Sequence, residues 1–136
     1  MKTYNINAIE QFNRDIENDV DKDCMLQMWG TAKNIINDLE RFYNDDFTEE
    51  ERENEEDNLW AYFDDVLDIN YTINSDFTYK GCELCVAWGG PGIWIDTNAG
   101  IIRCRWWGSN FNVWLDSDLC ELIDGVFSEY YEMSRY

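Results

Sequence analysis

The sequence predicts an α+β fold: N-terminal helices, then an antiparallel meander of four to five strands, then a C-terminal helix packed on the sheet. Two observations predict it. Up to about residue 68, apolar residues recur every three or four positions, as on one face of a helix. Beyond residue 68 they alternate every second position, and turn-forming glycines separate the runs. Helices followed by a block of strands are typical of α+β domains.

We expect a single domain over residues 1–136, with an acidic helical part at 1–68 and the sheet plus closing helix at 69–136. A chain of this length buries roughly two-thirds of its unfolded surface. Aromatic residues make up 16% of the chain, which indicates a packed core rather than an acidic disordered segment. No apolar run reaches about 18 residues and no apolar leader follows Met1, so we expect a cytoplasmic protein without a membrane partner.

Two helices are expected before residue 44. The first should cover residues 6–20, and the second residues 24–43 with Asp23 as its N-cap. Gly30 weakens the second helix by about 1 kcal/mol relative to alanine, or marks a break in it. The stripes expected to be buried are Ile6, Ile9, Phe12, Ile16 and Val20 in the first helix, and Leu26, Trp29, Ile36, Leu39 and Phe42 or Tyr43 in the second.

A third helix is expected to begin at Thr48. Thr48 and Glu51 have the spacing of a capping box, in which each side chain accepts a hydrogen bond from the other residue's backbone amide. Glutamates in the first turn also interact favourably with the positive end of the helix dipole. The apolar face of this helix should lie near its C-terminal end, at Leu59, Trp60, Phe63, Val66 and Leu67.

The strands of the meander are expected where the two-residue period holds, at residues 69–73, 84–88, 93–96, 101–107 and 111–115. The glycine-rich segment 89–92 should be a tight hairpin connection, because it lacks the Lys-Ser/Thr of a phosphate-binding loop and no helix is expected to begin there. Asp116 or Ser117 should cap the final helix. Its inward residues should be Leu119, Ile123, Val126 or Phe127, and Tyr130.

Tryptophans are concentrated in the sheet. Trp88 shares a strand face with two aliphatic residues and should be in the core. Trp106 and Trp107 are adjacent on a strand, so one should face outward as a candidate interface anchor, unless the final helix covers it. Arg103 and Arg105 share a strand face with Trp107, and we expect them to form ion pairs or cation–π contacts within the molecule.

The sequence shows no catalytic, cofactor or metal site. Cys82 and Cys85 have CxxC spacing, but residues three apart on a strand point to opposite faces, and a zinc site would need two further ligands in a chain without histidine. We therefore expect the five cysteines to be reduced and buried. A glycosidase-type carboxylate pair is the enzymatic alternative that aromatic strands would favour. However, no carboxylate stands apart and no Ser/His or Cys/His pair exists, so we expect no enzyme.

Acidic residues concentrate between Asp45 and Asp68, where twelve acids accompany a single base, and the whole chain has a formal charge of −19. Helix positions three or four apart lie about 5–6 Å from each other. Glu49, Glu53 and Asp57 would therefore form a row that imitates the closely spaced phosphates of DNA. The alternative is a solvated face that only aids solubility. The residues expected to contact a partner are Asp45, Asp46, Glu49, Glu50, Glu53, Asp57, Asp64 and Asp65.

This charge also restricts the class of partner. Self-repulsion destabilises a compact chain, and a strongly positive partner would offset it. Nucleic acid and anionic membranes would be repelled by a protein with a pI near 4.1. The expected partner is a basic nucleic-acid-binding protein, bound without any cofactor, and the oligomeric state stays open.

The segment 88–97, WGGPGIWIDT, followed by Trp106–Trp107–Gly108 and the closing helix, resembles small acidic proteins of phages and mobile elements over roughly residues 69–132. In size and charge the chain is similar to anti-CRISPR and antirestriction DNA mimics. The resemblance implies an inhibitor that occupies the nucleic-acid-binding groove of a CRISPR effector or restriction enzyme in the host bacterial cytoplasm. No residue role carries over, because DNA mimics share charge geometry and not a motif. The alternatives are an immunity protein or antitoxin for one cognate toxin, and an acidic adaptor without a nuclease target.

Overall fold

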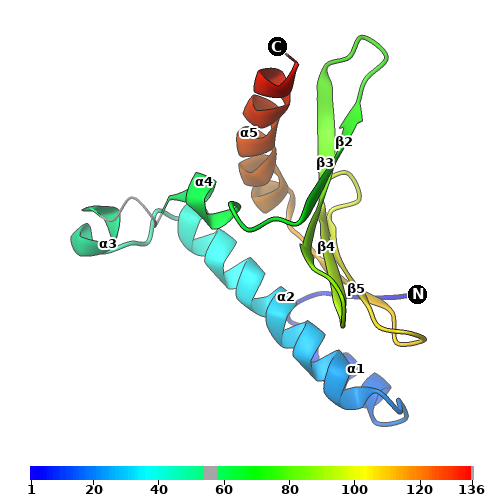
Figure 1. Cartoon of the computed structure of the whole chain (residues 1–136). Coiled ribbons are helices and arrows are strands. Elements are labelled where there is room, and N and C mark those ends of the chain that lie inside the picture. The colour runs from blue at the N-terminus through cyan, green and yellow to red at the C-terminus, as the bar shows by residue number, and fades with distance from the viewer. Residues whose placement is uncertain (54–57, 136) are drawn as a thin grey trace.

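The computed structural model describes residues 1–53 and 58–135 (Figure 1). It confirms the α+β fold, with helices at both ends of the chain and the C-terminal helix packed on the sheet. The elements are β1 (Lys2–Tyr4), α1 (Ile9–Ile16), α2 (Lys22–Tyr43), α3 (Glu49–Glu53), α4 (Leu59–Tyr62), β2 (Asp68–Ile73), β3 (Tyr79–Ala87), β4 (Gly92–Asp96), β5 (Ile101–Arg105), β6 (Phe111–Trp114) and α5 (Ser117–Ser134).

The sheet has the strand order β1-β6-β5-β4-β3-β2. Strands β2 to β6 form the expected antiparallel meander, in which each strand pairs with its neighbour in sequence. The sixth strand was not expected: β1 pairs in parallel with β6, and Lys2 lies opposite Phe111. A strand of only three residues is too short to show a two-residue period, so its place depends on tertiary packing.

One face of the sheet carries the core, and Figure 1 shows α2 and α5 on that face. Leu84, Ile95 and Ile102 lie opposite one another on β3, β4 and β5, and all three are buried. Leu39 of α2 and Ile123 of α5 are fully buried in the same core cluster. No described helix covers the opposite face in Figure 1, and we call this the open face of the sheet.

The helices before residue 44 differ from expectation at their ends. Helix α1 stops at Ile16, and Val20 beyond it is 97% exposed. The backbone turns between the helices, where the Asp21 amide donates to Asp19 Oδ1 at 2.7 Å. Asp21, not Asp23, therefore occupies the N-cap position of α2. Helix α2 continues through Gly30 without a break.

The expected buried stripes of these two helices are confirmed only in part. Phe12, Ile16, Trp29, Ile36 and Leu39 are buried. The expected stripe members that are instead exposed are Ile9, Val20, Leu26 and Tyr43. Within α1 only Phe12 and Ile16 are buried, and the helix ends before Val20.

The closing helix α5 follows Asp116, as expected, and packs on the sheet. Its buried residues are Leu119, Cys120, Ile123, Val126 and Phe127. Helix α4 packs against it, since the rings of Phe63 and Phe127 are 5.2 Å apart and those of Trp60 and Tyr130 are 4.5 Å apart. Within the described part of the chain, no helix combines the length and apolar character needed to cross a bilayer.

Strand β1 is held in place by Tyr4 and its contacts. The Tyr4 ring is buried and meets Phe12 edge-on, with centroids 5.4 Å apart. The Tyr4 hydroxyl donates to Asp15 on α1, and Lys2 Nζ lies 3.0 Å from Asp15 Oδ1. The Asp15 carboxylate on α1 therefore contacts the side chains at both ends of β1, Lys2 and Tyr4.

We expect Asp15→Asn to lower the thermal midpoint at neutral pH and to flatten its acid dependence. The Tyr4 hydroxyl, and then the Lys2 ammonium, hold the pKa of Asp15 below its ordinary value. The stabilisation is therefore complete above the unfolded-state pKa of about 3.9, and it is lost as pH falls through the folded-state pKa. Thermal unfolding from about pH 7 to about pH 2 tests this, with the exposed Asp118→Asn as control. Parallel curves for wild type and Asp15→Asn would contradict it.

Candidate functional site

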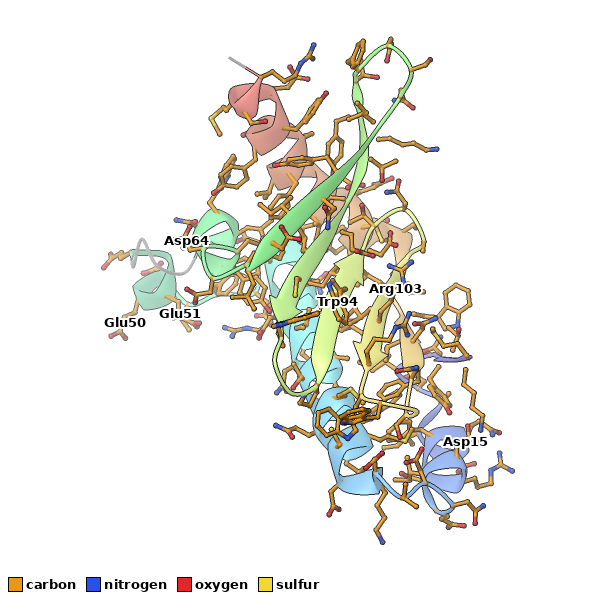
Figure 2. All side chains as sticks on the ribbon, turned by 45° about the vertical axis from the view of Figure 1, so that its right-hand side comes forward. Asp15, Glu50, Glu51, Asp64, Trp94 and Arg103 are labelled. Carbon is orange, nitrogen blue, oxygen red and sulfur yellow. The ribbon has the colours of Figure 1, made fainter. Side chains whose placement is uncertain are left out.

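The exposed carboxylates expected to contact a partner gather where α2 ends, in α3 and in the turn after α4. Figure 1 shows α3 beyond the end of α2, on the side away from the sheet, and Figure 2 labels Glu50, Glu51 and Asp64 in this region. We call the exposed set the acidic end. It consists of Asp45, Asp46, Glu49, Glu50, Glu53, Asp64 and Asp65.

Glu51 attaches α3 to α2. The Thr48 amide donates to Glu51 Oε1 at 3.2 Å and the Glu51 amide donates to Thr48 Oγ1 at 3.1 Å, which confirms the predicted capping box. Arg41 Nη2 lies 2.6 Å from Glu51 Oε2. The Thr48 amide, and then Arg41, hold the pKa of Glu51 below its ordinary value. Glu51 is thus engaged within the molecule, whereas Glu49 and Glu50 beside it are exposed.

Aromatic contacts hold the segment that joins α2 to α3. The ring of Phe42 lies 4.9 Å from that of Phe47 and 5.4 Å from that of Tyr62. The Arg41 guanidinium lies over the Phe47 ring, 4.8 Å from its centroid. The Tyr62 hydroxyl donates to Asp38 at 3.0 Å. These contacts hold the segment before α3, and they also hold α4 against the end of α2.

The prediction of one continuous third helix from Thr48 onward is wrong. As described, α3 ends at Glu53, and a separate helix α4 begins after Asn58. Asn58 has an extended backbone, and its side chain accepts from the Ala61 amide at 2.8 Å, as an N-cap does. Like charges three and four residues apart disfavour one long helix here. Asp57 lies outside the described residues, so only Glu49 and Glu53 of the expected phosphate-like row are placed.

The other carboxylates of the acidic end come from several backbone conformations. Asp45 has a φ of 51°, in the left-handed region. The Asp46 amide donates to the Arg41 carbonyl at 2.9 Å, just beyond the end of α2. Asp64 and Asp65 lie in the turn after α4. The acidic end is therefore an irregular anionic surface and not a regular ladder of carboxylates.

The prediction that Trp88 belongs to the core is wrong, because its side chain is 73% exposed. The pairing of β3 with β4 shifts register between Cys85 and Ala87. A bulge adds a residue to one strand and changes the face to which the following side chains point. The prediction that one of Trp106 and Trp107 faces outward is confirmed, since Trp107 is 82% exposed.

The two arginines of β5 have different surroundings on the open face. Arg103 forms ion pairs with Glu83 and Asp96, as expected, and Figure 2 labels it on the forward side of the sheet. For Arg105 the expectation is wrong: among the described residues it has neither an ion pair nor a cation–π contact. Its Nη1 instead lies 2.9 Å from Met1 Sδ. Glu83 and Asp96, which lie opposite each other on β3 and β4, are already paired with the neighbouring Arg103.

The cysteines are free thiols. Cys82 belongs to the core cluster and Cys85 lies outside it, so the two thiols of the CxxC spacing do not meet at one site. Burial raises the pKa of Cys82 to about 11 and that of Cys104 to about 12. Thiols with such values stay protonated at neutral pH and are poor nucleophiles and ligands. Within residues 1–53 and 58–135, no three metal-ligating side chains gather at one point.

Comparisons with protein-family models, with curated proteins and with solved structures give no match to this chain. The chemistry of the acidic end itself indicates what this surface can do. Acid–base catalysis needs carboxylates whose pKa values are separated by their surroundings in a cleft. The carboxylates of the acidic end are exposed, which favours long-range attraction of a cationic surface instead.

Proposed function

We propose that the protein is an inhibitor encoded by a phage or mobile element, and that its acidic end occupies the nucleic-acid-binding groove of a host defence nuclease. A CRISPR effector or a restriction enzyme has the required Lys/Arg-lined groove. The observation that carries the proposal is the set of seven exposed carboxylates at one end of a chain with a net charge of −19. The inhibitor would act in the bacterial cytoplasm, without catalysis or cofactor.

Electrostatics explains how such an inhibitor competes with DNA. A groove that binds polyanions attracts the acidic end over about a Debye length, which speeds association and makes it dependent on salt. The irregular arrangement of the carboxylates supplies the negative potential of a phosphate backbone without reproducing its spacing. The anchored backbone around Glu51 limits the entropy lost when the surface is bound.

We expect reversal of Glu49, Glu50 and Glu53 to lysine to abolish capture of the partner. Each change would replace an attractive contact with a repulsive one, and loss of one partner of a desolvated charge pair at an interface costs about 2–5 kcal/mol. Wild-type and variant proteins would be immobilised and exposed to bacterial lysate at about 0.1 M salt. Retained proteins would be identified by mass spectrometry, purified, and tested for loss of DNA binding in the presence of the wild-type protein.

The matched control reverses Asp118, Glu121 and Glu129 on α5, which are exposed and distant in sequence from the acidic end. It changes the net charge equally, so retention by the control but not by the first variant shows that position matters. Equal retention by both variants would overturn the proposal. Capture of one toxin that binds no nucleic acid would replace the proposed function with that of an immunity protein.

A further inference from the structure

A second candidate site lies on the open face of the sheet, between the loop after β3 and the loop after β5. Its volume of about 570 Å³ is in the range of ligand-binding pockets. Trp88 packs edge-on against Trp94 with centroids 5.7 Å apart, and Trp106 does the same against Trp107 at 6.2 Å. We call this site the tryptophan pocket. Apart from glycines, it is lined by Trp88, Trp94, Arg105, Trp106, Trp107 and Asn110.

Glycines and two residues with positive φ shape the backbone around the tryptophan pocket. A Cβ atom at Gly92 would lie 2.4 Å from the Trp94 ring, so the indole lies directly on the glycine backbone. Gly89 turns the loop after β3 with a φ of 95°. Trp107 has a φ of 47°, which is uncommon for a large side chain, and its ring is exposed beyond the end of β5. The contact between Trp94 and Gly92 and the two turns therefore define the shape of the pocket.

The charge of the tryptophan pocket differs from that of the rest of the chain. Residues 86–115 contain one acid, Asp96, and two bases. Arg103 is engaged by that acid and by Glu83. Arg105 is the charged side chain of the pocket lining and forms no ion pair among the described residues; Glu83, the carboxylate that acts on it electrostatically, is itself paired with Arg103. Its guanidinium is therefore available for a charge-assisted hydrogen bond to a carboxylate of a ligand.

The lining restricts the class of ligand. Single-stranded nucleic acid would stack on the indoles, but it carries a phosphate at every nucleotide, whereas the lining of the pocket offers one cation, Arg105, in a chain with a net charge of −19. An oligosaccharide presents many hydroxyl groups, whereas besides the indole N–H groups the pocket offers only the polar side chains of Arg105 and Asn110. Proline-rich segments dock in aromatic-lined grooves in a preformed polyproline II conformation, which requires few hydrogen bonds and little ordering.

We propose that the tryptophan pocket binds a proline-rich segment of a partner protein, with proline rings against the exposed indoles of Trp88 and Trp107 and a neighbouring carboxylate on Arg105. Figure 2 labels Trp94 on the forward, open face, whereas Glu50 and the rest of α3 lie off to one side, beyond the helices. One molecule can therefore use both surfaces at the same time. The tryptophan pocket does not depend on the function proposed for the acidic end.

A peptide titration tests the pocket directly. The probes are the blocked peptide Pro-Pro-Pro-Asp-Pro-Pro-Pro and its Asn counterpart, followed by calorimetry and by the NMR signals of the indole N–H groups. We expect the Asp peptide to shift the signals of Trp88 and Trp107 and to bind about tenfold more tightly than the Asn peptide. Trp107→Ala should weaken binding at least about tenfold. Arg105→Gln should remove the difference between the two peptides.

Trp114→Ala is the matched control, because Trp114 is 54% exposed on β6 but lies outside the pocket lining. It should bind the Asp peptide as the wild type does, and circular dichroism should show that all variants are folded. Absence of peptide binding, unchanged binding after Trp107→Ala, or saturation of the pocket by maltohexaose or oligothymidine instead would overturn the proposal. The assay contains no nuclease, so its outcome is separate from that of the lysate experiment.

Discussion

Phe12→Ala is expected to lower the free energy of unfolding by about 3–5 kcal/mol. The Phe12 side chain is fully buried and stacks on Trp29, with centroids 4.4 Å apart and planes at 16°. It also meets Tyr4 and Phe111 edge-on, both at 5.4 Å. These three partners come from α2, β1 and β6, so they cannot collapse together into the cavity without moving whole elements. The loss should therefore include the full cost of the cavity.

Urea unfolding followed by circular dichroism measures this loss, and the thermal midpoint should fall by roughly 10–15 °C. Phe77→Ala is the matched control, because it makes the same chemical change at a hairpin position that is 62% exposed. Its effect should stay within about 0.5 kcal/mol. If Phe12→Ala does not fold, Phe12→Leu should fold with a smaller loss that still exceeds that of the control. Equal losses at the two positions would contradict the proposed packing.

The meander and the closing helix were predictable because their signals are local. Alternation along a strand and the turn residues between strands act over a few positions, and the apolar stripe of α5 runs through Leu119, Ile123 and Phe127. The capping box at Thr48 is local in the same way, and its two hydrogen bonds are present. Strand β1 has no such signal, because it forms only when β6, more than a hundred residues later, is beside it.

The acidic end was predictable in composition but not in geometry. The run of acids is visible in the sequence, but the N-cap at Asn58 that starts a new helix was hidden within an apparently helical period. The tryptophan pocket was missed because the bulge after Cys85 reverses the face of Trp88. One signal was present: Gly92 two residues before Trp94 on a strand leaves room for an indole on the backbone.

Arg103→Met, a change on the open face, is expected to cost about 2–3 kcal/mol of stability. The Arg103 guanidinium is paired with Glu83 on β3 and Asp96 on β4, and so ties three strands together. Asp96 is buried and accepts only one further hydrogen bond from the described residues, from the Ala99 amide at 2.9 Å. Methionine keeps the apolar stem but leaves the Asp96 carboxylate without its counter-charge, and an uncompensated buried charge is costly. Partial exposure of Arg103 keeps the effect below that of a fully buried pair.

Arg105→Met is the matched control, since Arg105 lies two residues along the same strand and has no ion pair among the described residues. It should change stability by no more than about 0.5 kcal/mol in urea unfolding. The double variant Arg103→Met/Asp96→Asn should lose less than the sum of its single variants, because the buried charge is then removed together with its partner. Additive losses, or equal losses for the two arginines, would contradict this assignment. A large loss for Arg103→Met alone means that one guanidinium stabilises the sheet and the other contributes little to its stability.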